Sequence, residues 1–328
     1  MSRLHARILG EDGRPAWQGL WRRSNRHLGL HWEWLDAAAA RVGRAIRVGV
    51  FSQADDLLAG ACFVERKRLV FTEWHHPSPV PFAGLLLGGS PPAESGLREI
   101  LQALSCLVKA HTSLAEIVFE PGFADVRGLL WDGWTALPHY NYVSRVETPD
   151  DLETQADNAA RRQVRKAREA GCTLHSGEEC LGPLLQLWEE TRQRQRLPAY
   201  HNAQTFELLA SRWGQRDQED EDGVRVSVHL VRSPEGEPLA GGLIGEDPQR
   251  CYYLLGASAD KAEGTGAPSL LHTEVTRVLA GSRCPLLYDW VGANTPRIAQ
   301  FKKKFRPGLE YYHRARFETR ALRTLRGR

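Results

Sequence analysis

The sequence predicts an α+β protein made of two similar halves. Three short landmarks of the first half recur in the second half at nearly one spacing. This regularity indicates two tandem copies of a unit of about 150 residues, the usual size of one domain. The landmarks are AGA (Ala59–Ala61) with AGG (Ala240–Gly242), EIVFE (Glu116–Glu120) with LLYDW (Leu286–Trp290), and YNYVSRVE (Tyr140–Glu147) with YYHRARFE (Tyr311–Glu318), at offsets of 181, 170 and 171 residues.

We therefore place one domain at residues 1–150 and a second at residues 151–328, the second including a basic linking helix. Each domain is expected to be a mixed, mostly antiparallel sheet flanked by helices. Two such domains would leave a central cleft between them, and substrates commonly bind at domain boundaries.

The first half contains helical and strand-like patterns in alternation. Residues 16–45 look helical and carry four tryptophans and an alanine-rich stretch. Apolar residues between Leu97 and Val108 keep helical spacing, which predicts an amphipathic helix. The remaining predicted elements are strands at 46–52, 57–64, 69–75 and 115–119, a short helix near 123–131 and a strand pair within 134–147.

The second half opens on Thr148, which is expected to cap a helix that Gly171 ends. A further helix is expected at 181–194. The same order of elements then returns, so the second half repeats the first. The predicted elements are strands near 224–232, 239–246 and 250–257, a helix near 267–280, and strands near 286–290 and 309–318.

Composition is that of a soluble globular protein, with 42% hydrophobic and 25% charged residues. No run approaches the ~18 apolar residues of a membrane span, and the N-terminal segment lacks a signal-peptide pattern, so we expect a cytoplasmic protein without stable membrane insertion. The six cysteines stand apart, which argues against a disulfide framework. We expect no metal site, because His75 and His76 beside Glu73 lack a further ligand at fitting spacing.

Two basic segments suggest an anionic partner. One is a helix whose apolar stripe leaves its cations on the exposed face, and the other runs from Phe301 to Arg328 with ten Lys/Arg and two acidic residues. A solvated helix face and a solvated tail are the alternatives. The candidate nucleic-acid contacts are Arg161, Arg162, Arg165, Lys166, Lys303 and Lys304.

Three further patterns could bind or act on a substrate. Arg196 and Tyr200 flank a helix-breaking proline, and a guanidinium with a phenol suits a phosphate. A glycine-containing loop follows the strand CYYLLGAS and could present backbone N–H groups to a pyrophosphate. In FKKKF, the two phenylalanines would anchor a helical turn, leaving Lys302 able to stabilise charge on a reacting carbonyl.

Taken in order, YYLLGAS, a helix, YDW and FKKKF resemble the second half of the FemABX family of non-ribosomal peptidyltransferases, and RRQVRKAREAG resembles the basic helix between its repeats. The resemblance implies two tandem GNAT-like domains. It also implies that Lys302 contacts the reacting carbonyl, that Arg196 and Tyr200 grip a nucleotide-sugar diphosphate, and that Tyr253 lies near a phosphate-binding tyrosine.

The chain departs from the family pattern in the first half. After the HWEW segment, where the family has an acceptor-binding lysine, Asp36 and Ala37–Ala40 stand instead. The loop PFAGLLLGG lacks the family's acidic residue, and no inserted coiled-coil hairpin is visible. These departures argue for an acceptor other than a UDP-linked muropeptide.

The expected function is amide formation by transfer of an aminoacyl group from aminoacyl-tRNA to an amine on an anionic acceptor, for which a peptidoglycan precursor is one candidate. An activated ester needs mainly positioning and charge stabilisation, and no nucleophile motif is required. No cofactor is expected. One alternative is an acyl-CoA-dependent N-acyltransferase of the GNAT superfamily, with acyl-CoA as donor substrate. Another is a non-catalytic RNA-binding module. The sequence leaves the general base and the oligomeric state open.

Overall fold

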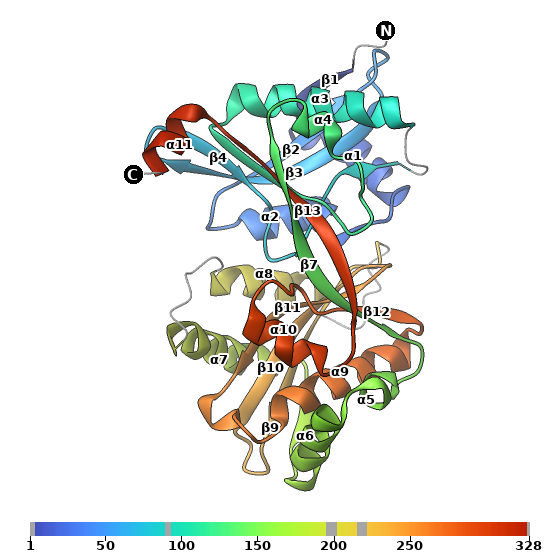
Figure 1. Ribbon diagram of the computed structural model, residues 1–328, viewed down its shortest axis with the longest axis vertical. Helices are drawn as coiled ribbons and strands as arrows, with labels where there is room; N and C mark the ends of the chain where they lie inside the picture. Colours follow the sequence, from blue (N-terminus) through green and yellow to red (C-terminus); the bar gives the residue numbers. More distant parts are fainter. Residues whose placement is uncertain (1–3, 89–92, 195–201, 215–221, 327–328) are drawn as a thin grey trace. The chain divides into compact units, whose positions relative to one another are not determined.

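The computed structural model describes residues 4–88, 93–194, 202–214 and 222–326. The chain forms two compact units (Figure 1). Unit 1 comprises Met1–His139 and Tyr311–Arg328, and unit 2 comprises Tyr140–Glu310. Both units are mixed α/β structures, so the predicted α+β class of two tandem units is confirmed.

Unit 1 is built on a mostly antiparallel sheet. Among the pairings of the described residues, β4 and β6 run in parallel, with Glu73 opposite Leu114. The strand order is β1-β2-β3-β4-β6-β13, and β5 pairs with β3. The strands are β1 (His5–Ile8), β2 (Arg44–Phe51), β3 (Leu57–Arg68), β4 (Phe71–His75), β5 (Leu86–Leu87), β6 (Leu114–Val118) and the unit 1 part of β13 (Gly308–Glu318).

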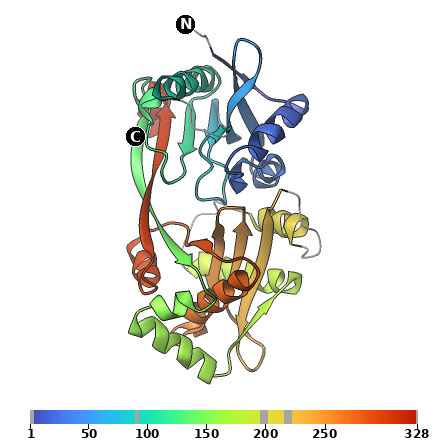
Figure 2. The same cartoon turned by 90° about the vertical axis from the view of Figure 1, so that its right-hand side faces the viewer.

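The amphipathic helix of the first half is confirmed as α3 (Glu94–His111). Its Leu101, Leu104 and Val108 are fully buried in the core formed with β2, β3 and β6. Periodic apolar residues on one helix face drive this packing because burying them removes their surface from water. Figure 2 shows α3, in teal, on the opposite side of the strands from the dark blue helices of the N-terminal segment.

The predicted helical stretch at 16–45 is wrong as a single element. It forms α1 (Arg14–Arg22), a short 3-10 turn (Leu28–Leu30) and α2 (Trp32–Ala39), and β2 begins at Arg44. The tryptophans explain the interruption, because the indole of Trp17 donates to the carbonyl of Leu30 at 2.9 Å and that of Trp21 to the carbonyl of His27 at 3.0 Å. The predicted strand pair within 134–147 is likewise one strand, β7 (Thr135–Val146). The short helix α4 (Arg127–Leu130) precedes it.

Unit 2 repeats the scheme of unit 1. Its strand order is β8-β9-β10-β11-β12-β7, and again one pair, β11 with β12, is parallel. Its strands are β8 (Thr173–Ser176), β9 (Arg225–Arg232), β10 (Pro238–Glu246), β11 (Cys251–Ser258) and β12 (Leu286–Asp289), together with the end of β7. Its helices are α5 (Asp151–Gln155), α6 (Asn158–Glu169), α7 (Leu181–Arg194), α8 (Ala203–Trp213), α9 (Ala267–Ser282) and α10 (Pro296–Lys303). Helix α11 (Arg320–Arg326) belongs to unit 1.

The division into units differs from the sequence-based boundaries at two places. Residues 311–328 lie in unit 1, and residues 140–150 lie in unit 2. The reason is strand pairing: β13 completes the unit 1 sheet beside β6, with Ala315 opposite Ile117, and the end of β7 completes the unit 2 sheet beside β12, with Ser144 opposite Tyr288. The final strand of each sequence repeat therefore belongs to the sheet of the other.

The helix expected to start at Thr148 and end at Gly171 is in fact two helices, α5 and α6. Thr148 does not cap a helix with its own side chain; instead the carboxylate of Asp151 accepts from the backbone N–H of Thr148 at 3.0 Å. The side chain of Asp157 then caps α6 by accepting from the backbone N–H of Ala160 at 2.7 Å. Gly171 follows α6 in the left-handed region, with φ of 74°, as expected.

Candidate active site

A tight loop follows β12 in unit 2 and has an unusual backbone. Val291 (φ 53°) and Gly292 (φ 84°) are consecutive residues in the left-handed region. A β-branched residue rarely adopts this conformation without support from its surroundings. These two left-handed residues bring the carbonyls of Trp290, Val291 and Gly292 to one side of the loop, where a single cation can reach all three.

That cation is Lys302, the predicted catalytic residue, near the end of α10. Its Nζ donates to the carbonyl of Trp290, to that of Val291 at 2.9 Å and to that of Gly292 at 2.8 Å. The side chain is buried, and burial lowers the pKa of Lys302 to about 8. In this arrangement all three ammonium protons hold the loop, so Lys302 could contact a reacting carbonyl only by giving up one of these bonds.

Asp289, the last residue of β12, holds the same loop from the other side. It is fully buried, and its carboxylate accepts from the side-chain amide of Asn141 at 2.7 Å and from the backbone N–H of Val291 at 2.8 Å. Burial raises the pKa of Asp289 to about 6, against the opposing effect of Arg250 at 3.2 Å. Asp289 thus makes structural hydrogen bonds at a strand end, the role that its place in the LLYDW motif favours.

Tyr253 lies on β11 and packs flat against the sheet. Its hydroxyl donates to the carbonyl of Gly241 at 3.2 Å. A Cβ at Gly242 would come within 2.4 Å of the Tyr253 ring, and a Cβ at Gly256 within 2.3 Å of its hydroxyl. The glycines of the AGG landmark and of YYLLGAS therefore provide the space that this ring occupies. In the sequence these glycines stand out only as landmarks of the internal repeat.

His272, on α9, brings Tyr253 and Lys302 into one cluster and was missed from the sequence. Its ring lies 4.6 Å from that of Tyr253 and 4.4 Å from that of Trp290, and its Nδ1 shares a hydrogen bond of 2.9 Å with the hydroxyl of Tyr288. Burial, and to a lesser degree the charge of Lys302, lowers the pKa of His272 to about 3, so the imidazole is neutral at pH 7. Nothing in its sequence context, a helix interior, distinguishes it.

The parallel strands β11 and β12 separate beside this cluster. Only two residues of each strand pair, Cys251 with Tyr288 and Tyr252 with Asp289. Beyond them β12 ends, whereas β11 continues to Ser258 after a bulge against β10 between Leu243 and Ile244. Backbone groups of β11 past the bulge are thus left on the β12 side without a ladder partner in β12, next to the Lys302 loop.

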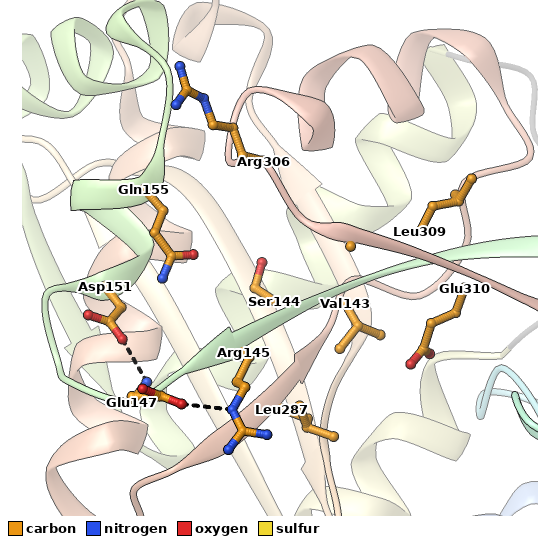
Figure 3. Close-up of a pocket in the computed structure, with 11 residues that line it drawn as sticks. Val143, Ser144, Arg145, Glu147, Asp151, Gln155, Leu287, Arg306, Leu309 and Glu310 are labelled. Carbon is orange, nitrogen blue, oxygen red and sulfur yellow. Dashed lines mark hydrogen bonds and ion pairs between the residues drawn. The ribbon is translucent and has the colours of Figure 1, made fainter.

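A pocket of about 440 Å³ opens on unit 2 beside the end of β7 (Figure 3). Glu147 at its edge accepts from the guanidinium of Arg145 at 2.9 Å. Glu310, also in the wall, pairs with Arg250 at 2.8 Å, and Arg250 in turn contacts Asp289. The pocket wall is therefore connected through ion pairs to the residue that holds the Lys302 loop. Its lining residues are Val143, Ser144, Arg145, Glu147, Asp151, Gln155, Leu287, Arg306, Gly308, Leu309 and Glu310.

The predicted nucleic-acid contacts lie on two helices. Arg161, Arg162, Arg165 and Lys166 are exposed on α6, although Lys166 donates to the carbonyl of Gly264 at 2.7 Å. Arg165 lies 3.6 Å from Glu169, and Arg168 forms ion pairs of 2.7 Å with Glu153 and Glu274. Neighbouring carboxylates therefore neutralise part of the positive charge that suggested an anionic partner. Near the end of α10, Lys303 is exposed and Lys304 half-buried.

Arg196 and Tyr200, the predicted phosphate-binding pair, lie outside the described residues. In the described part of the chain, no group of three or more His, Cys, Asp or Glu side chains is arranged to hold a metal ion. Across the same part, none of the helices is long and apolar enough to cross a bilayer.

Known structures resemble this chain over nearly its whole length. FemX aligns with a TM-score of 0.67 at 14% identity, covering 94% of this chain and 96% of FemX. A tandem GNAT protein from the clavulanic acid biosynthesis pathway aligns with a TM-score of 0.57 at 12% identity, covering 95% and 98%. The C-terminal domain of an Agrobacterium fabrum protein assigned as a lysylphosphatidylglycerol synthetase gives 0.57 at 13%, covering 96% and 93%.

Residues 155–303 match the family model described as an acetyltransferase (GNAT) domain. The chain has the tandem GNAT fold seen in FemX and in the clavulanic acid pathway protein. Comparison with curated protein sequences gives no significant match. The matched region spans α6, the separating strands and α10, so it includes the cluster around Lys302.

Proposed function

We propose that this protein is an acyltransferase that moves an aminoacyl group from aminoacyl-tRNA to an amine of an anionic acceptor and forms an amide. The observation that carries the proposal is the likeness to FemX, which extends through both units rather than one GNAT domain. The Agrobacterium fabrum neighbour, whose name refers to a lysylated lipid, supports aminoacyl transfer on the same fold. A peptidoglycan precursor is the acceptor that the family resemblance favours.

The basic surfaces favour a nucleic-acid donor. On α6, Arg161 and Arg162 are exposed, as is Lys303 on α10. Contacts of such side chains with phosphates provide most of the affinity in sequence-independent nucleic-acid binding. Binding of the donor should therefore weaken steeply between low and moderate salt.

In the proposed reaction the acceptor amine attacks the ester carbonyl, the C–N bond forms, and the C–O bond to the tRNA ribose breaks. The leaving oxygen takes a proton and the amine loses one. Lys302 would act by fixing the loop of residues 290–292, and by supplying positive charge close to the carbonyl when one of its loop bonds opens. Its lowered pKa of about 8 is consistent with proton exchange near neutral pH.

Arg196, Tyr200 and Tyr253 are proposed to hold the anionic part of the acceptor. For Tyr253 this requires its hydroxyl to turn from the carbonyl of Gly241 towards a phosphate. Because its ring is fixed between two glycines and His272, only this small rotation is needed.

A second candidate is acyl-CoA as the donor, favoured by the loop that precedes α9. Gly264 (φ 74°) and Gly266 (φ 86°) give this loop a tight course, and a Cβ at Gly266 would lie 2.0 Å from the carbonyl of Gln163. The loop leads into α9, a helix of 16 residues, and glycine-containing loops before helices can present backbone N–H groups to a pyrophosphate. The match to an acetyltransferase family model agrees with this donor.

A donor competition experiment distinguishes the two candidates. The purified protein is incubated with a pool of amine-bearing cell-wall precursors and either mixed aminoacyl-tRNA or acetyl-CoA, and the products are identified by mass. The proposal predicts precursors heavier by an aminoacyl residue with aminoacyl-tRNA only. Acetylated products with acetyl-CoA would instead establish the second candidate, and salt-sensitive tRNA binding without any product would point to an RNA-binding module.

A further inference from the structure

The hairpin between β3 and β4 in unit 1 ends in two strongly exposed aliphatic side chains. Arg68 pairs with Phe71, so the loop consists of only Leu69 and Val70. Their exposed fractions are 92% and 89%, the highest of any large hydrophobic residue in the described part of the chain. Soluble proteins do expose single apolar residues, but two adjacent ones at the outermost point of a hairpin are exposed without local compensation.

The backbone conformation of this loop makes a leucine at its first position unusual. Leu69 has a φ of 55°, in the left-handed region where Gly or Asn is favoured. A two-residue hairpin loop normally uses these small or polar residues. Here an exposed leucine occupies the strained position, which local turn chemistry does not explain. A role for its side chain outside the fold would explain it.

Positively charged side chains lie at the same edge as the apolar tip. Lys67 and Arg68 precede the loop and are exposed. The N-terminus of α11 lies at the same edge of the sheet, because the backbone N–H of Ser113 donates to Thr72 at 2.8 Å and that of Thr319 donates to Ser113 at 2.9 Å. Figure 1 labels β4 and α11 at this same end of unit 1.

Helix α11 adds side chains of the same two kinds. Arg320 and Arg323 are exposed, and Leu325 is 58% exposed. The nearby acidic residue Glu318 is turned away from solvent, with 15% of its side chain exposed, and lies 3.4 Å from Arg316. The edge therefore presents apolar side chains beside exposed cations. The carboxylate of Glu65 also interacts with Lys67, but it is hydrogen-bonded to Arg44.

We propose that this edge of unit 1 docks on the surface of an anionic phospholipid bilayer. Leu69 and Val70 enter the boundary between headgroups and acyl chains, and Lys67, Arg68, Arg320 and Arg323 bind lipid phosphates around them. Transfer of aliphatic side chains from water to acyl chains is favourable. Each basic side chain near an anionic surface makes a further favourable contribution to the binding free energy. The inference stands whether the donor is aminoacyl-tRNA or acyl-CoA.

The apolar tip favours lipid over the other partners that a basic surface could bind. Single-stranded nucleic acid is bound by stacking on aromatic side chains, and both tip residues are aliphatic. A symmetric contact with a second copy would place Lys67 and Arg68 against the same cations of that copy. Charge complementarity thus selects an anionic surface that can also take up aliphatic side chains.

Co-sedimentation with sucrose-loaded vesicles tests the proposal on the full chain. The wild type is expected to bind vesicles of equal phosphatidylglycerol and phosphatidylcholine and to bind pure phosphatidylcholine much less. The double variant Lys67→Gln/Arg68→Gln should lose roughly 10- to 30-fold in partition coefficient, since each cation contributes about a factor of five near such a surface. The variant Leu69→Ser/Val70→Ser should lose about 10-fold.

Matched controls separate this edge from total charge and general apolar exposure. Arg162→Gln/Arg165→Gln removes two exposed cations from unit 2, and Leu208→Ser removes an aliphatic side chain that is 42% exposed on α8. Both controls should change the partition by less than about threefold. Circular dichroism and thermal melting verify that each variant is folded.

Two results would overturn the proposal. One is the absence of selective binding to anionic vesicles, or a loss in the hairpin variants no larger than in the controls. The other would come from a parallel binding assay with bulk tRNA. If Lys67→Gln/Arg68→Gln loses affinity for tRNA while Leu69→Ser/Val70→Ser keeps both vesicle binding and tRNA binding, this edge is a nucleic-acid surface.

Discussion

Lys302 and Asp289 bind opposite ends of one residue, Val291. The carboxylate of Asp289 accepts from the Val291 N–H at 2.8 Å, and the ammonium of Lys302 donates to the Val291 carbonyl at 2.9 Å. Both charged groups are buried. Together they stabilise a β-branched residue in the left-handed region and so fix the loop that follows β12.

Replacement of Lys302 by Met should destabilise the protein as well as reduce transfer. The substitution leaves three loop carbonyls without their common donor, and unsatisfied buried carbonyls cost about 1–3 kcal/mol each before relaxation. We expect a net loss of about 2–4 kcal/mol in urea unfolding. Lys303→Met, at the exposed neighbour, is the control and should change stability by less than about 0.5 kcal/mol. Equal losses in both variants would contradict the loop-holding role.

Asp289 should make stability depend on pH in the acidic range. Its pKa is about 6 in the folded protein, against 3.8 for an unperturbed aspartate side chain, so the folded state binds its proton more tightly than the unfolded chain does. This contribution is present below pH 4 and is lost as pH rises towards 6. Asp289→Asn lacks it, so the difference in unfolding free energy, wild type minus variant, should fall by on the order of 2–3 kcal/mol between pH 4 and 6. A flat difference would exclude a raised pKa.

Glu116, in unit 1, should have the opposite pH dependence. Its carboxylate contacts Arg314 at 2.9 Å and His75 at 3.5 Å, and these partners outweigh burial and lower its pKa to about 2. Its stabilisation is present above pH 4.5 and is lost as pH falls towards 2. Glu116→Gln should therefore be less stable than the wild type at pH 6 and similar to it near pH 2. Glu99→Gln, at an exposed position of α3, should show no such convergence.

Gly242→Ala should displace Tyr253. The new Cβ would lie 2.4 Å from the Tyr253 ring, so the ring or the strand must move, at a cost of about 1–3 kcal/mol. In a Tyr253→Ala background, Gly242→Ala should cost less than it does in the wild type, because the clash is then absent. Gly281→Ala is the control: no atom lies within 4 Å of its Cβ position in α9, and alanine favours helix. An equal cost of Gly242→Ala in the wild-type and Tyr253→Ala backgrounds would disprove the steric explanation.

Local sequence patterns predicted much of the fold because they act within single elements. The spacing from Leu97 to Val108 specified α3, and the predicted helix at 181–194 coincides with α7. The internal repeat predicted two similar sheets, since equivalent runs of apolar residues form equivalent strands. The predicted helix ends were less accurate. The sequence pattern placed a cap at Thr148, whereas α6 is capped by a hydrogen bond to the side chain of Asp157.

The candidate site was only partly predictable. The FKKKF motif predicted a helical turn anchored by its two phenylalanines, and in the structure Phe305 and Lys302 are buried there. It could not reveal that Lys302 meets three carbonyls, since these belong to a loop ten to twelve residues earlier whose course depends on Asp289 and Asn141. His272 carries no signal in its helix and becomes part of the site only through packing.

By itself, the sequence determined the repeat, the order of helices and strands, and the position of the basic segments, because periodicity and composition are properties of neighbouring residues. Only the tertiary structure showed which sheets β7 and β13 complete and that Gly242 and Gly256 leave room for the ring of Tyr253. It also showed that the ammonium of Lys302 donates to the carbonyls of the loop after β12. These outcomes depend on contacts between residues far apart in the chain, and such contacts form only when whole elements pack and their buried polar groups find partners.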